Sequence, residues 1–110
     1  MATHNPLTRD KKQKALVLLQ HNQPGEALPL LEQVCRINRR DTDARFMLAA
    51  AHQALGAFEQ AADAYRQVIA LRPDHADAYY YLGNTYLALG NGPAAVDSFE
   101  QAIRLRPDYL

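Results

Sequence analysis

The chain has 110 residues, enough for one domain, and its 48% hydrophobic and 22% charged residues are ordinary for a globular protein and unlike a disordered one. Twelve basic and twelve acidic residues give a formal net charge of zero, which argues against a nucleic-acid binder because that class carries a marked basic excess. No apolar run approaches the ~18 residues of a membrane span, and Ala15 to Leu19 is too short for a signal peptide, so we expect a cytoplasmic protein without a membrane partner.

The first predicted pair of helices follows a lead-in of residues 1–7. Apolar residues at helical spacing predict a helix from Thr8 to His21, with Thr8 as its N-cap. Pro24 suits the first turn of a second helix, because its missing N–H is not needed there. That second helix is predicted to end near Asn38.

Two further pairs follow the same plan. The second pair is predicted at about Asp43 to Leu55 and Phe58 to Leu71, with Gly56 as a left-handed cap between them. The third pair is predicted at about Asp77 to Leu89 and from Pro93 until Arg106-Pro107-Asp108. Because short turns force neighbouring helices to run antiparallel, we expect an all-α protein of six antiparallel helices in three stacked hairpins.

The helix pairs are copies of one 34-residue unit. When Ala76–Tyr109 is aligned with Thr42–His75, 14 of the 34 positions are identical by direct count. Small residues recur at corresponding places on the two helices of each pair, namely Ala15, Ala49 and Gly83 on the first helix and Ala27, Ala61 and Ala95 on the second. Such pairs let the helix axes approach to the near end of the usual ~8–10 Å packing range.

Across nearly the whole chain, this period resembles the tetratricopeptide repeat. The third unit fits the pattern throughout, with Tyr79, Leu82, Gly83, Tyr86, Ala95, Phe99, Ala102 and Pro107. The second unit fits at Leu48, Ala49, Ala61, Tyr65 and Pro73, while Arg45 and His52 stand where aromatic residues are usual. The first unit fits at Ala15, Leu18, Ala27, Leu31 and Val34, but Lys11 and Lys14 replace apolar residues and Arg39 replaces the closing proline.

The resemblance implies one domain over residues 1–110, an α-solenoid of three tetratricopeptide repeats (8–41, 42–75 and 76–109) wound as a right-handed superhelix. It also implies a non-catalytic protein–protein interaction scaffold that binds a peptide or a helix of another protein in its concave groove. Two alternatives stay open: a self-association module, or an accessory module of a larger enzyme.

The first helix of each pair has a face that would line this groove. Spacing by three and four residues gives the candidates Lys12, Gln13, Phe46, Met47, Gln53, Tyr80, Tyr81, Asn84 and Leu87. Aromatic rings offer contact area at low entropic cost, and amide groups can pair with a peptide backbone. The alternative is that Phe46, Tyr80 and Tyr81 pack against neighbouring helices.

The carboxylate clamp by which some family members hold chaperone tails is not expected. In those relatives Lys, Asn and Arg side chains hold the carboxylate, whereas here only Lys12 matches. Leu16, Met47, Asp77 and Tyr81 occupy the other places, and the acidic Asp77 would repel a carboxylate.

No catalytic, cofactor or metal site is expected either. The four histidines have no spacing that places two on one helix face, these being His4, His21, His52 and His75. The single Cys35 lies in an apolar stripe, where thiols are usually inert. Gly90-Asn91-Gly92 follows a predicted helix and precedes no lysine, which argues against a phosphate-binding loop.

The last pair of helices carries apolar residues with no predicted partner, at Leu89, Val96, Phe99 and Ile103. Repeat stacks normally cover such a face with a further helix. We therefore expect the chain to be a piece of a longer protein, with a second copy of the chain as the alternative cover.

Overall fold

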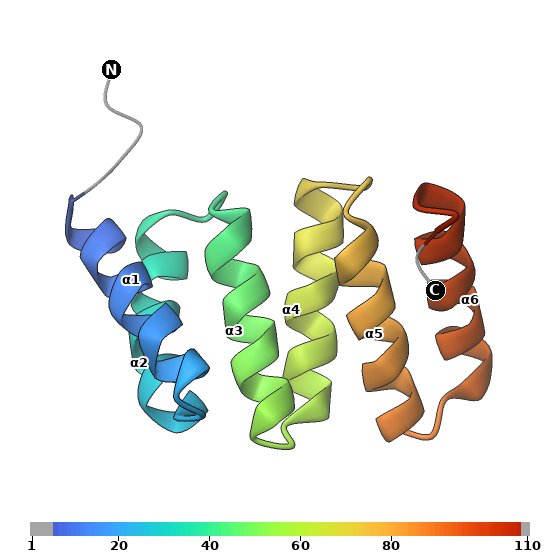
Figure 1. The fold of residues 1–110 in the computed structure, drawn as a ribbon, viewed down its shortest axis with the longest axis horizontal. Helices are drawn as coiled ribbons and strands as arrows, with labels where there is room; N and C mark the ends of the chain where they lie inside the picture. Colours follow the sequence, from blue (N-terminus) through green and yellow to red (C-terminus); the bar gives the residue numbers. More distant parts are fainter. Residues whose placement is uncertain (1–5, 109–110) are drawn as a thin grey trace.

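The computed structural model describes residues 6–108, which form six α-helices in a row (Figure 1). The helices are α1 (Pro6–Gln20), α2 (Pro24–Ile37), α3 (Thr42–Ala54), α4 (Phe58–Leu71), α5 (Ala76–Ala88) and α6 (Gly92–Leu105). The connecting turns alternate between the two edges of the row, so neighbouring helices run antiparallel. This confirms the predicted all-α solenoid, and each predicted helix boundary after residue 21 lies within two residues of the structure.

Helix α1 begins earlier than predicted. It starts at Pro6, which belongs to the expected lead-in, because proline is well suited to the first helical position, where no N–H is needed. Thr8 lies inside the helix and is buried, so its assignment as the N-cap is wrong. The first five residues of the expected lead-in lie outside the described residues.

Side-chain caps mark the starts of α3 and α5, and a glycine closes α3. A carboxylate oxygen of Asp41 accepts from the Ala44 N–H at 3.0 Å, and His75 Nδ1 accepts from the Ala78 N–H at 3.2 Å. Gly56 closes α3 with a φ of 77°, a left-handed conformation that costs glycine little, as predicted.

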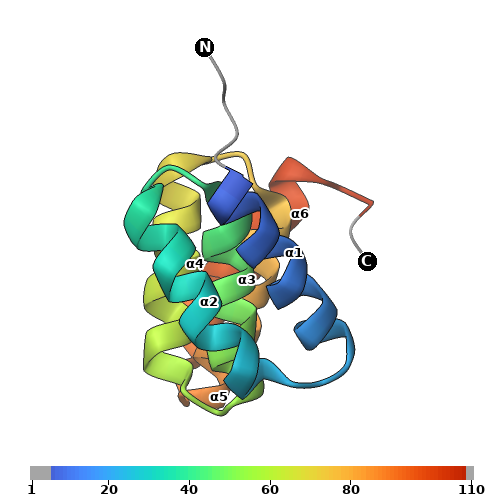
Figure 2. The same cartoon turned by 90° about the vertical axis from the view of Figure 1, so that its left-hand side faces the viewer.

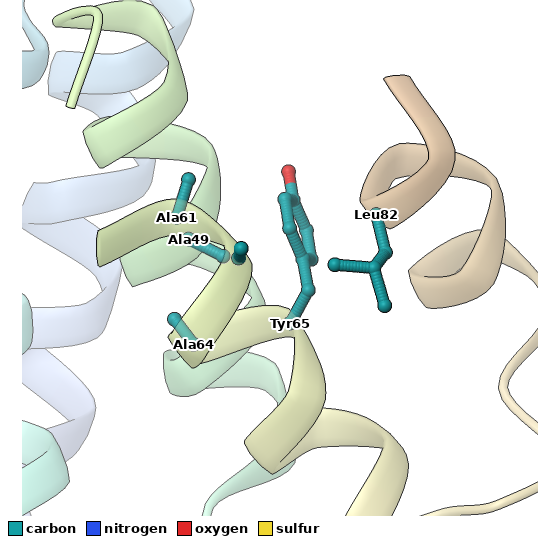
Figure 3. Packing of buried hydrophobic residues seen from close by; sticks show 6 residues of the cluster. Ala49, Ala61, Ala64, Tyr65 and Leu82 are labelled. Carbon is teal, nitrogen blue, oxygen red and sulfur yellow. The ribbon is translucent and has the colours of Figure 1, made fainter. Parts of the chain in front are cut away.

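The hairpins are held together by the small residues that the repeat pattern indicates. Ala15, Ala27, Ala49, Ala61 and Ala95 are all fully buried. In the middle of the stack, Tyr65 of α4 and Leu82 of α5 fill the space beside the alanines of α3 and α4, as Figure 3 shows. Small residues within each hairpin and large ones between hairpins therefore build three buried clusters along the stack.

Figure 2 looks along the stack from the end at which α1 and α2 lie in front. None of the helices in the described range is both long and apolar enough to cross a membrane.

Candidate functional site

A hollow of about 540 Å³ opens where the first helices of the three hairpins lie side by side. Its lining comes from α1, α3, the turn before α3 and the start of α5: Thr8, Arg9, Lys12, Gln13, Leu16, Asn38, Asp41, Asp43, Phe46, Met47, His75 and Asp77. Four of the nine predicted groove residues, Lys12, Gln13, Phe46 and Met47, are therefore brought together here. A concave site of this size is typical of ligand-binding surfaces.

Lys12, the basic residue among the predicted groove candidates, forms an ion pair inside the protein. Lys12 Nζ lies 3.1 Å and 3.0 Å from the two carboxylate oxygens of Asp41, whose side chain also caps α3. Both side chains are largely shielded from water, so this ion pair is screened less than a surface pair. Lys12 thus helps to fix α1 against the start of α3.

Two further acidic side chains, Asp43 and Asp77, also line the hollow. Asp77 is paired with Arg106 at 3.4 Å. Asp43 is exposed and has no ion-pair partner within residues 6–108. Lys12 is neutralised by Asp41, while the arginine of the lining, Arg9, is exposed and lies 3.9 Å from Asp10.

Two stacked rings, Phe46 and His75, are part of the lining of the hollow. Phe46 stacks on His75 at 5.2 Å and meets Tyr65 and Tyr81 edge-on at 5.6 and 5.7 Å. The Tyr65 hydroxyl donates to Gln53 Oε1 at 2.8 Å, and burial raises the pKa of Tyr65 above its usual value. Phe46 therefore both packs against its neighbours and faces the hollow, whereas the Gln53 side chain is committed to Tyr65.

The other predicted groove residues lie on α5, outside the hollow. Tyr80 packs against Phe99 at 5.8 Å, as the alternative packing interpretation requires. Tyr81 is 38% exposed and Leu87 is 55% exposed. The side-chain amide of Asn84 is half-buried and has no hydrogen-bond partner in the described part of the chain. This amide lies three residues from the exposed Tyr81 on the same helix, so the two side chains could contact one ligand.

Sequence reasoning missed the contributions of the turns. Asn38, Asp41 and His75 line the hollow from outside the helix faces considered. A signal existed, because Asp41 and His75 are one 34-residue period apart and both cap the next helix. Side chains at such positions lie beside the first turn of α3 or α5, and therefore beside the hollow.

Clusters of metal-ligating side chains and a reactive thiol would be signs of chemistry elsewhere in the chain. No group of three or more His, Cys, Asp or Glu side chains within residues 6–108 is placed to hold a metal ion. Cys35 is buried, and this burial raises its thiol pKa, which disfavours the reactive thiolate.

The repeated helical hairpins agree with what known protein families show. Two sequence models described as tetratricopeptide repeat match residues 46–109 and 18–63. The chain belongs to the tetratricopeptide repeat family. No curated protein sequence matches it.

Solved structures with the same fold include YrrB, described as a tetratricopeptide repeat protein with an unusual peptide-binding site. It is 30% identical, with a TM-score of 0.91, over 96% of this chain and 54% of that protein. MamA is 24% identical with a TM-score of 0.91, over 93% of this chain and 60% of MamA. A mutant form of MamA is 26% identical with a TM-score of 0.87, over 94% of this chain and 76% of that one. The chain thus spans little more than half of the first two proteins.

Proposed function

We propose that this tetratricopeptide repeat domain is a non-catalytic scaffold that binds a segment of another protein along the inner face of α1, α3 and α5. The observation that carries the proposal is the hollow of about 540 Å³, in which apolar Leu16, Phe46 and Met47 lie beside polar side chains. Binding sites commonly combine apolar contact area with a few polar groups that fix orientation.

The unpaired amides extend this surface along the stack. Gln13 on α1 is exposed, and Asn84 on α5 is half-buried; neither has a hydrogen-bond partner within the described residues. An amide presents both a donor and an acceptor, which are the groups that a peptide backbone needs. The description of YrrB, 30% identical, supports a peptide as the ligand.

The test is a titration of fluorescently labelled peptides, of varied sequence, against the wild type and the Gln13→Ala/Asn84→Ala variant. Neither side chain makes a hydrogen bond within the described residues, so the variant should fold normally, and peptide affinity should fall about tenfold if each lost hydrogen bond to the peptide contributes its typical ~0.5–1.5 kcal/mol. Glu100→Ala, on exposed α6, is the matched control and should bind as the wild type does. Equal peptide affinity of the double variant and the wild type would contradict binding along the inner face of α1, α3 and α5.

A second candidate function is self-association through α6. Val96 is 55% exposed, whereas its counterpart one repeat earlier, Ala62, is only 2% exposed because α5 lies against α4. Leu89 and Ile103 are also exposed, while Phe99 is covered in part by Tyr80. This apolar face suits a second copy of the chain or a further repeat.

A further inference from the structure

Two departures from the repeat pattern meet at one place in the structure. Arg39 stands where the later repeats have Pro73 and Pro107, and Arg45 stands where the third repeat has Tyr79. The sequence does not relate the two, because one is in a turn and the other in a helix. In the structure Arg45 Nε donates to the Arg39 carbonyl oxygen at 3.0 Å.

A third departure adds to the same charge. Arg40 stands where the later repeats have Asp74 and Asp108, so the sign of the charge is reversed at the turn before α3. The acid in that turn, Asp41, is already neutralised by Lys12. Within residues 6–108, Arg39, Arg40 and Arg45 have no ion-pair partner.

The Arg45 guanidinium is oriented by neutral groups. Besides the Arg39 carbonyl, it donates through Nη1 to the Gln67 side-chain oxygen on α4. These acceptors hold the planar group in place without cancelling its charge. Arginine offers more donors than these two bonds use, so a preorganised fork remains available to an anionic group.

This fork lies at a shallow hollow of about 440 Å³. The hollow is lined by Arg39, Arg45, Gln67, Ala70 and Leu71, and it shares no residue with the groove formed by α1, α3 and α5. Two of these lining residues, Ala70 and Leu71, are the apolar last residues of α4. A ligand for this hollow therefore needs an acidic side chain close to an apolar one.

We propose that this edge of the stack, between the α2–α3 turn and α4, is a docking site for an acidic segment of a partner protein, in which Asp or Glu binds Arg45 and Arg39. Charged hydrogen bonds of this fork type are about twice as strong as neutral ones. An acidic peptide fits better than a nucleic acid, because the basic residues are confined to one turn and the start of α3, the chain has no net charge, and the hollow is also lined by the apolar Ala70 and Leu71.

The test measures fluorescence anisotropy of a labelled peptide of alternating Glu and Leu residues. The variants are Arg45→Tyr, which introduces the third repeat's own residue, and Arg39→Gln/Arg40→Gln, which changes only exposed side chains. Arg104→Gln removes one arginine from α6, where its partner is likewise a glutamine, Gln101, and so provides the matched control. Circular dichroism checks that every variant keeps its helices.

The expected result is a loss of affinity of about tenfold or more in each of the two edge variants, as for a lost charged hydrogen bond, and no change in Arg104→Gln. Gln13→Ala/Asn84→Ala should bind this peptide as the wild type does, which separates the edge from the groove. Wild-type affinity in both edge variants would overturn the proposal, and so would an equal loss in Arg104→Gln. Tighter binding of a single-stranded oligonucleotide than of the peptide, dependent on Arg45, would also overturn it.

Discussion

Gly83 shows how one repeat position can carry different constraints in different hairpins. The corresponding residues of the first two repeats are Ala15 and Ala49, both fully buried. At Gly83, however, an added Cβ would lie 2.6 Å from Cε1 of the Phe99 ring. The methyl group that the other repeats accept is therefore excluded here by the ring that packs against α5.

We predict that Gly83→Ala destabilises the protein by about 1–3 kcal/mol, because the Phe99 ring must shift from its place against α5. Urea unfolding followed by circular dichroism measures the change. Gly25→Ala is the control: its Cβ would meet only Leu55, at 4.0 Å, and removing a helical glycine should leave stability unchanged or raise it by about 0.4–1 kcal/mol. A Gly83→Ala protein as stable as the wild type would contradict this close contact.

Single residues also show where sequence patterns stop being sufficient. The repeat pattern correctly predicted the buried alanines, since they face the partner helix in every hairpin. It could not predict that Lys12 is bound to Asp41 or Gln53 to Tyr65. Those contacts join different helices, and their geometry depends on side-chain conformations that spacing along one helix does not determine.

At the scale of elements, the start of α3 combines a side-chain cap with an ion pair to another helix. Asp41 caps the helix through the Ala44 N–H and pairs with Lys12 of α1. By contrast, Asn91 caps α6 through the Ala94 N–H at an exposed site and makes no ion pair within the described residues. Comparison of the two ends separates the contribution of the cap from that of the ion pair.

We predict that Asp41→Ala destabilises the protein more than Asn91→Ala, whose loss of a cap should cost about 1 kcal/mol. Asp41→Asn keeps a capping oxygen but loses the ion pair, so its cost should fall between zero and that of Asp41→Ala. Urea unfolding of the three variants at low and high salt is the measurement. If Asp41→Asn and Asp41→Ala were equally destabilised, the cap would contribute nothing.

The helices themselves could be predicted from the sequence, because each hairpin repeats the same apolar period and the same turn residues. Helix α4 was predicted from Phe58 to Leu71, as the structure has it. The first hairpin was less accurately predicted at its start, where Pro6 opens α1. Its divergent sequence gives no second copy against which a start can be checked.

At the scale of the whole molecule, the same face of the second helix can be compared between the second and third repeats. The face of α4 that holds Ala62 and Tyr65 is covered by α5, and both residues are almost fully buried. The corresponding face of α6 holds Val96, which is 55% exposed, and Phe99, which packs in part against Tyr80 of α5, and no helix follows α6 in the described residues (Figure 1). Exposed apolar area of this kind favours association.

We predict that the chain associates reversibly as its concentration rises, and that Val96→Ser/Ile103→Gln weakens this association. Burial of the two side chains in a contact would contribute roughly 1.5–3 kcal/mol each, and the polar replacements remove most of that gain. Sedimentation equilibrium over a range of micromolar concentrations measures the association constant. Leu87→Gln is the control, because Leu87 is as exposed as Val96, at 55%, but lies on α5. A wild type that stays monomeric throughout would eliminate self-association through α6, while an equal effect of Leu87→Gln would move the contact to the groove.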